Sequence, residues 1–99
     1  MNKYNNASVA RLYRAIRLLH SEAECRAFFE DLCTIKELSD MAQRFETAIL
    51  LDEGQSYQSI SEKVNISSAT ISRVNRALCY GSDGYKTAIQ KLKANGEIT

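Results

Sequence analysis

Apolar residues recur every three or four positions along the first half of the chain, which is the spacing of one face of an α-helix. Three such stripes lie within residues 8–19, 25–32 and 35–49. The chain has no proline and its first glycine is Gly54, so few residues interrupt a helix before that point. The pattern therefore predicts an all-α fold that begins with three helices.

Capping residues predict where these helices begin and end. Ser8 is expected to start the first helix. Ser21 and Thr34 are each followed three residues later by a glutamate, a capping-box pattern in which each side chain binds the backbone N–H of the other residue. Gly54 is expected to end the third helix, because glycine readily takes the left-handed conformation that closes a helix.

The three apolar faces are expected to point inward. A chain of 99 residues buries a smaller share of its surface than a larger domain does, so a partner is expected to cover part of these faces. The length fits one domain over residues 1–99. The residues predicted to point inward are Val9, Leu12, Tyr13, Ile16 and Leu19, then Cys25, Phe28, Phe29 and Leu32, and finally Ile35, Leu38, Met41, Ala42, Phe45, Ala48 and Ile49.

After the first glycine the segments become short and rich in serine, asparagine and threonine. Two short helices are expected over residues 57–64 and 67–80, the second capped by either Ser67 or Ser68. A glycine-bounded break follows, and a last helix is expected within residues 83–95.

Residues 57–78 match the requirements of a helix-turn-helix, which packs two short helices at a steep angle through a tight turn. Ile60 and Val64 give the first helix an inward face, and Ser61 is the small residue where the second helix can approach. Asn65 stands where the turn needs a left-handed backbone, for which asparagine is the best substitute for glycine. The second helix has its own apolar stripe, formed by Ile71, Val74 and Leu78.

The second of these helices carries the residue types of a DNA recognition helix, whose first turns enter the major groove. Small hydroxyl residues let the backbone come close to DNA, and the methyl groups of Ala69 and Thr70 suit a thymine methyl. Arg73 and Arg76 lie one turn apart and can reach guanine edges or phosphates. The predicted DNA-binding residues are Ser67, Ser68, Ala69, Thr70, Ser72, Arg73 and Arg76 on this helix and, toward the phosphate backbone, Gln58 and Lys63 on the preceding one.

Charge is unevenly distributed although the net charge is only +1. Residues 1–20 carry four basic side chains and no acid, residues 21–55 carry nine acids and three bases, and residues 56–99 carry six bases and three acids. Basic ends around an acidic middle are typical of a protein whose ends approach an anionic polymer such as double-stranded DNA.

Other chemistry is not indicated. The three cysteines form no CxxC pair, His20 is the only histidine, and no phosphate-binding glycine loop occurs. No apolar run approaches the length of about 18 residues that a membrane span needs, and the N-terminus has no signal-peptide core. We therefore expect a cytoplasmic protein that is not an enzyme and uses no metal or cofactor, with Cys25 and Cys33 filling the core.

Two other interpretations stay open. The chain could be a protein-interaction module in which the acidic middle helices dock a partner and the helix-turn-helix is only structural. Alternatively, it could be a ligand-gated regulator that binds DNA only when loaded with an unknown small molecule.

The residues Ser68 to Leu78, followed by Tyr80-Gly81 and Gly84-Tyr85, resemble the Trp repressor superfamily, and the YerC/YecD type most closely. The resemblance covers about residues 8–92 and is most specific within 41–85. It implies an intertwined homodimer in which residues 8–53 form the dimerisation region and the helix-turn-helix units project from a shared core. Two recognition helices one DNA turn apart imply a two-fold symmetric operator and a regulator that represses by occluding a promoter.

The resemblance also implies a ligand site, because the tryptophan repressor holds its corepressor with two arginines that match Arg44 and Arg73. The neighbouring positions depart from the family pattern. Val74 replaces a glycine that leaves room for the ligand, and Ala77 replaces a serine that holds the ligand's amino group. We therefore expect that tryptophan is not the corepressor here. Arg44 could instead pair with an acid such as Asp40 or Glu46.

Overall fold

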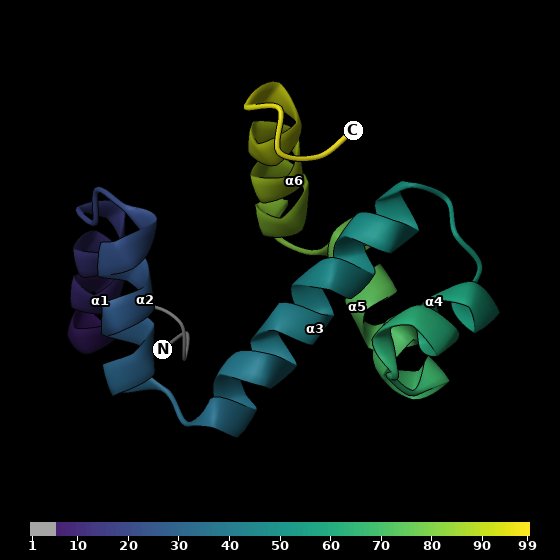
Figure 1. Ribbon diagram of the computed structural model, residues 1–99, viewed down its shortest axis with the longest axis horizontal. Helices are drawn as coiled ribbons and strands as arrows, with labels where there is room; N and C mark the ends of the chain where they lie inside the picture. Colours follow the sequence, from purple (N-terminus) through teal and green to yellow (C-terminus); the bar gives the residue numbers. More distant parts are fainter. Residues whose placement is uncertain (1–5) are drawn as a thin grey trace. The chain divides into compact units, whose positions relative to one another are not determined.

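The computed structural model describes residues 6–99, and this range contains six helices and no strand (Figure 1). The all-α prediction is therefore confirmed. No helix within this range is both long and apolar enough to cross a membrane. The helices are α1 (Ala7–Arg17), α2 (Glu22–Leu32), α3 (Ile35–Asp52), α4 (Tyr57–Val64), α5 (Ser68–Tyr80) and α6 (Gly84–Ala94).

Contacts within the chain group into two units, residues 1–38 and 39–99. The first unit contains α1 and α2, and the second contains most of α3 together with the last three helices. The expectation of a single domain over all 99 residues stays a prediction.

The caps of the first unit follow the predicted pattern with two differences. Asn6 caps α1, because its side chain accepts the Val9 N–H at 2.9 Å, so the helix begins before Ser8. Ser21 caps α2 as predicted by accepting the Glu24 N–H at 3.1 Å. However, the Glu24 carboxylate accepts the N–H of His20, at 2.7 Å, instead of the N–H of the capping serine.

The capping box before α3 is reciprocal, as predicted. The Glu37 N–H donates to the Thr34 hydroxyl at 3.0 Å, and the Thr34 N–H donates to the Glu37 carboxylate at 2.8 Å. The N–H groups of Thr34 and Glu37, two of those that the start of the longest helix leaves without a helical partner, are therefore satisfied.

The apolar stripes of residues 6–46 contain no fully buried residue. Phe28 and Phe29 make an edge-to-face contact with ring centroids 5.6 Å apart, yet both are only half-buried. Tyr13 is 56% exposed and Ile35 is 91% exposed. The prediction that these stripes point into a core is therefore wrong for residues 6–46 of the single chain, whereas Ala48 and Ile49 at the end of the third stripe are buried as predicted. Two helices of 11 residues each cannot enclose a core by themselves.

The described core belongs to the second unit. One cluster joins α3, α5 and α6 through buried aliphatic side chains, and a second joins the end of α3 to α4 and α5. Since α4, α5 and α6 all pack on the C-terminal half of α3, this half positions the helix-turn-helix (Figure 1). The first cluster consists of Ala48, Ile49, Val74, Leu78 and Ile89, and the second of Leu50, Ile60 and Ile71.

Glycine closes α3 as predicted. Gly54 has a φ of 89°, its N–H donates to the Leu51 carbonyl at 2.9 Å, and the Gln55 N–H donates to the Leu50 carbonyl at 3.1 Å. This pair of hydrogen bonds satisfies the last free carbonyls of the helix and turns the chain toward α4.

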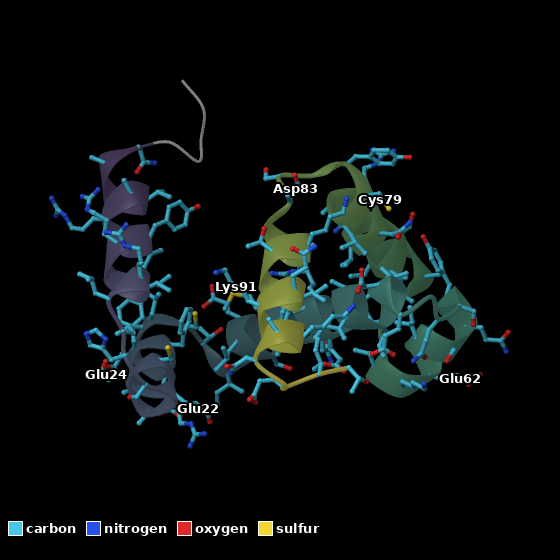
Figure 2. All side chains as sticks on the ribbon, turned by 90° about the horizontal axis from the view of Figure 1, so that it is seen from above. Glu22, Glu24, Glu62, Cys79, Asp83 and Lys91 are labelled. Carbon is cyan, nitrogen blue, oxygen red and sulfur yellow. The ribbon has the colours of Figure 1, made fainter. Side chains whose placement is uncertain are left out.

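The connection from α5 to α6 is short, because α6 begins at Gly84. Asp83 precedes it in a left-handed conformation with a φ of 65° (Figure 2). At the other end of α6, the Lys93 ammonium pairs with the Asp52 carboxylate at 2.8 Å. Ile98 packs on the first core cluster, so the C-terminal segment contributes to the core.

Candidate nucleic-acid interface

The turn between α4 and α5 has the predicted left-handed geometry. Asn65 has a φ of 58° and a ψ of 53°, and its N–H donates to the Ser61 carbonyl at 3.0 Å. The Ser61 hydroxyl donates to the carbonyl of Ile66 at 2.9 Å. The small residue predicted at the helix crossing therefore also holds the turn closed, a role that its size alone did not indicate.

Ser67, and not Ser68, caps α5. Its hydroxyl accepts the Thr70 N–H at 3.2 Å and lies 3.0 Å from the Thr70 hydroxyl. Ser68 is thereby left as the exposed first residue of the helix. The capping bond fixes where the exposed N-terminal turn of α5 begins.

The sides of α5 differ sharply in burial. Ile71, Val74 and Leu78 are at most 7% exposed and hold one side of the helix against the core. With about 100° per residue, Ala69 and Arg76 lie about 20° apart at the centre of the opposite side. Both are exposed. Ser68, Ser72 and Arg73, also exposed, flank them, and α5 contains no acidic residue. The helix therefore presents one continuous polar and basic face, which we call the α5 outer face.

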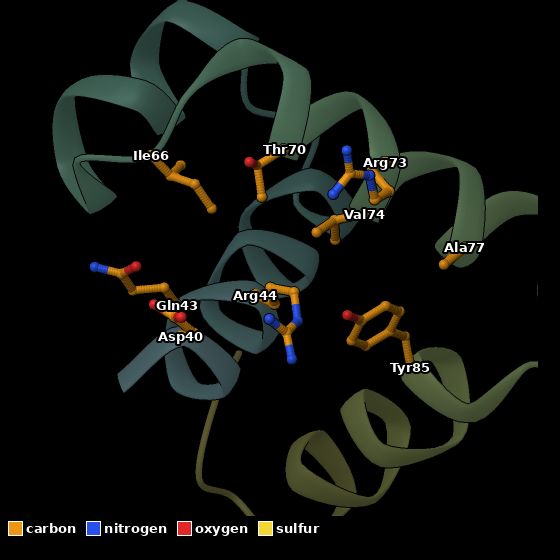
Figure 3. A pocket seen from close by; sticks show the side chains of 9 residues that line it. All are labelled: Asp40, Gln43, Arg44, Ile66, Thr70, Arg73, Val74, Ala77 and Tyr85. Carbon is orange, nitrogen blue, oxygen red and sulfur yellow. The ribbon is translucent and has the colours of Figure 1, made fainter. Parts of the chain in front are cut away.

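A pocket of about 330 Å³ lies beside this face, between α3, α5 and α6 (Figure 3). Thr70 and Arg73, both predicted to contact DNA, line it, and Thr70 is only half-exposed. Within α5, the predicted DNA-contacting residues thus separate into a central group and a group on the pocket side. The pocket is lined by Asp40, Gln43, Arg44, Ile66, Thr70, Arg73, Val74, Ala77 and Tyr85.

The two arginines predicted to hold a ligand do meet at this pocket. Arg44 reaches it from α3 and Arg73 from α5, and the Tyr85 hydroxyl points into the same space (Figure 3). Among residues 6–99, no ion pair or side-chain hydrogen bond includes either arginine. The alternative in which Arg44 pairs with an acid is therefore not seen, and two guanidinium groups are available to an anionic group.

Four lining residues were not predicted as DNA or ligand contacts, namely Asp40, Gln43, Ile66 and Tyr85. Asp40 lies one helical turn before Arg44 on α3, so helical spacing from that arginine could have identified it, whereas Gln43 directly precedes Arg44 and no such spacing marks it. Tyr85 comes from α6, where its ring stacks on Phe45 with centroids 6.4 Å apart. No spacing rule in the sequence relates the start of α6 to α3.

The predicted contacts on α4 do not share a face. Gln58 and Lys63 are both exposed, but five helical positions separate them by about 140° around the axis. The Lys63 ammonium donates to the side-chain carbonyl of Gln55 at 2.7 Å. Glu62, which is also exposed, lies about 40° from Gln58 and opposes an approach of phosphate on that side.

Comparison with known proteins gives consistent matches over nearly the whole chain. The family model of the Trp repressor protein matches residues 7–93. The uncharacterised protein YerC of Bacillus subtilis (strain 168) is 42% identical over 93 residues, which are 94% of this chain and 89% of YerC.

Solved structures agree. A TrpR-like protein from Eubacterium eligens ATCC 27750 superposes with a TM-score of 0.89 at 46% identity, over 94% of this chain and 96% of that one. A candidate Trp repressor from Staphylococcus aureus superposes with a TM-score of 0.87 at 36% identity, over 92% of this chain and 91% of that one.

Proposed function

The chain belongs to the Trp repressor family, and we propose that it is a sequence-specific, DNA-binding transcriptional regulator that uses residues 57–78 as a helix-turn-helix. This family is regulatory and not enzymatic, and we propose no catalytic role. The observation that carries the proposal is the α5 outer face, which is polar, basic and exposed while the opposite side of the same helix is fixed in the core. A major groove admits such a helix.

The structure supports distinct roles along α5. We assign base contacts to Ala69, Ser72 and Arg76, because they lie on the outer face away from the pocket. Ser68 and the N-terminal backbone of α5 suit a phosphate, since the free N–H groups at a helix start favour an anion. Arg73 lies between the outer face and the pocket, so it can contact DNA, a ligand, or both in turn.

We propose that the regulator is a homodimer in the cytoplasm. The observation in favour is that no residue within 6–46 is fully buried in the single chain, although the apolar stripes there carry large side chains such as Tyr13 and Ile35, which are 56% and 91% exposed. A second copy would cover them. A two-fold dimer would present two α5 helices to half-sites about 34 Å apart, and binding across a promoter would repress transcription.

The pocket favours a second candidate function, that of a regulator whose DNA binding depends on a small-molecule effector. A group held by Arg44 and Arg73 would bridge α3 to α5 and so bias the position of the outer face. We propose that this effector is not tryptophan, because Val74 and Ala77 line the pocket where more room and a hydroxyl would be needed. Calorimetric titration with L-tryptophan should show no binding, and micromolar affinity would refute this part.

Selection from a pool of random duplexes by the purified chain tests the function. The proposal predicts an enriched two-fold symmetric site whose half-sites are centred about 10 base pairs apart. It also predicts that Arg76→Ala weakens binding to this site. A pool without enrichment, at low salt and with or without a metabolite extract, would overturn the proposal and favour a protein-interaction module.

A further inference from the structure

A second basic surface lies on α1, far along the sequence from the helix-turn-helix. The helix carries Arg11, Arg14 and Arg17 and contains no acidic residue. All three arginines are exposed, and no ion pair or side-chain hydrogen bond within residues 6–99 includes them. We call these three residues the α1 arginine face.

The α1 arginine face is directed away from the packing side of its helix. Its members follow one another every three residues, so they rise by about 4.5 Å per step and sweep about 120° of the helix surface. Val9, Leu12 and Ile16, which are half-buried, are centred roughly on the opposite side. Packing of α1, by any partner, thus uses the apolar side and leaves the arginines accessible.

The two acids nearest to α1 in the sequence bind other groups and not this face. The Glu22 carboxylate pairs with Arg26 at 3.0 Å, and the Glu24 carboxylate accepts the His20 N–H at 2.7 Å. These two are the acids that follow α1 most closely in the chain, and both are engaged within α2 or its cap.

The helix dipole does not account for the pattern either. Arg14 and Arg17 lie in the last turn of α1, where the partial negative charge of the helix end favours a cation. Arg11 lies a turn earlier, beyond the reach of this effect. Ala7 and Ala10 occupy the same side of the helix as the arginines and are small enough to let a polyanion approach the backbone.

We infer that the α1 arginine face binds the phosphate backbone of the DNA duplex, as a second and sequence-independent contact in addition to that of α5. This rests on the proposed function, since it takes the partner to be the same duplex. Guanidinium groups form paired hydrogen bonds with phosphate oxygens, and such contacts add affinity without selecting bases. The surface therefore raises affinity for every duplex while α5 sets the preference among them.

Equilibrium binding at several salt concentrations tests the inference with the full chain. The double variant Arg11→Gln, Arg14→Gln should lower the log–log salt slope by about 3 to 4 units, since each dimer loses four phosphate contacts at about 0.9 units each. The ratio of affinities for the enriched and random duplexes should stay unchanged. The control Lys86→Gln, Lys91→Gln removes the same charge from α6, outside both basic faces, and should keep the slope within about one unit of wild type.

The outcomes separate this inference from the proposed function. A wild-type protein that binds no duplex overturns both. If the wild type binds but the α1 variant keeps its slope, or if both variants lose slope equally, only the α1 assignment falls. Helix content and molecular mass of each variant are compared with wild type in the same samples, so that a loss of folding or assembly is not mistaken for a lost DNA contact. Both should be unchanged, because the exposed positions should tolerate glutamine.

A second measurement needs no variant. Arginine modification by a dicarbonyl reagent can be located by mass spectrometry in wild-type protein with and without a random duplex. The duplex should protect Arg11 and Arg14 several-fold but not Arg26, which pairs with Glu22 on α2. Equal modification of Arg11 and Arg14 with and without the duplex would overturn the inference.

Discussion

Replacing Gly81 by alanine should destabilise the protein far more than the same change at Gly84, three residues later. Gly81 follows the last residue of α5, and its N–H donates to the Ala77 carbonyl at 2.9 Å. A methyl group on Gly81 would lie 3.1 Å from the carbonyl carbon of Ala77 and nearer still to its oxygen. A methyl on Gly84 would meet nothing within 4 Å.

The size of the destabilisation by Gly81→Ala depends on which atoms must move to make room for the methyl group. The obstacle to the Gly81 methyl is helix backbone, which cannot turn aside as a flexible side chain can. Relief requires the loss of the last hydrogen bond of α5, worth about 1 kcal/mol, and a displacement of the turn that costs roughly 1–3 kcal/mol. We expect a total loss of about 3 kcal/mol. Gly84→Ala should instead gain about 0.5 kcal/mol, because alanine favours helix.

Urea unfolding followed by circular dichroism, at one fixed protein concentration, measures both variants. With a slope of about 2 kcal/mol per molar urea, Gly81→Ala should unfold at a midpoint about 1.5 M below wild type. Gly84→Ala should unfold at or slightly above the wild-type midpoint. Equal midpoints for the two variants would refute the geometry described for the turn after α5.

Three further predictions concern the turn and the α3–α6 contact, each measured by the same unfolding experiment. Ser61→Ala removes the hydroxyl that donates to Ile66 and should cost about 1 kcal/mol. Asn65→Ala should also cost about 1 kcal/mol, because alanine tolerates a φ of 58° poorly, whereas Asn65→Gly should stay within about 0.5 kcal/mol of wild type. Lys93→Met and Asp52→Asn should show a coupling of no more than about 1 kcal/mol, because both partners are partly exposed at 40% and 34%. The first prediction would be contradicted if Ser61→Ala had no effect on stability, and the second if Asn65→Ala and Asn65→Gly were equally stable. A coupling of several kcal/mol between Lys93 and Asp52 would contradict the third.

The helix-turn-helix was predictable because its determinants are local. A left-handed turn needs a residue such as Asn65, and the capping hydroxyl of Ser67 lies three residues from the N–H that it accepts. The helical spacing of Ile71 and Val74 among polar neighbours likewise indicates which side of α5 is buried, without knowledge of distant contacts. The left-handed turn and the buried side of α5 were identified from the sequence and are confirmed, whereas the cap was left open between Ser67 and Ser68 and proves to be Ser67.

Features that depend on contacts between distant segments of the chain could not be predicted from the sequence. Helical periodicity predicted that Leu12 and Ile16 lie on a face that packs against other residues. It does not show whether these residues belong to the same chain or to another. In the same way, Thr70 and Arg73 had the right residue types for DNA contact, and only the approach of α3 and α6 reveals that they also line a pocket. The Tyr85 side chain completes that pocket from a helix whose path the sequence does not specify.

The central claim is that the α5 outer face reads bases, and a change of specificity tests it most directly. Ala69 is exposed at the centre of this face, and Ala69→Gln places there a side chain that pairs with adenine in the major groove. Selection from random duplexes should be carried out with wild type and variant in parallel. The account predicts that the preferred base changes at one pair of symmetry-related positions while the rest of the site is retained. Identical enriched sites for the two proteins would contradict it.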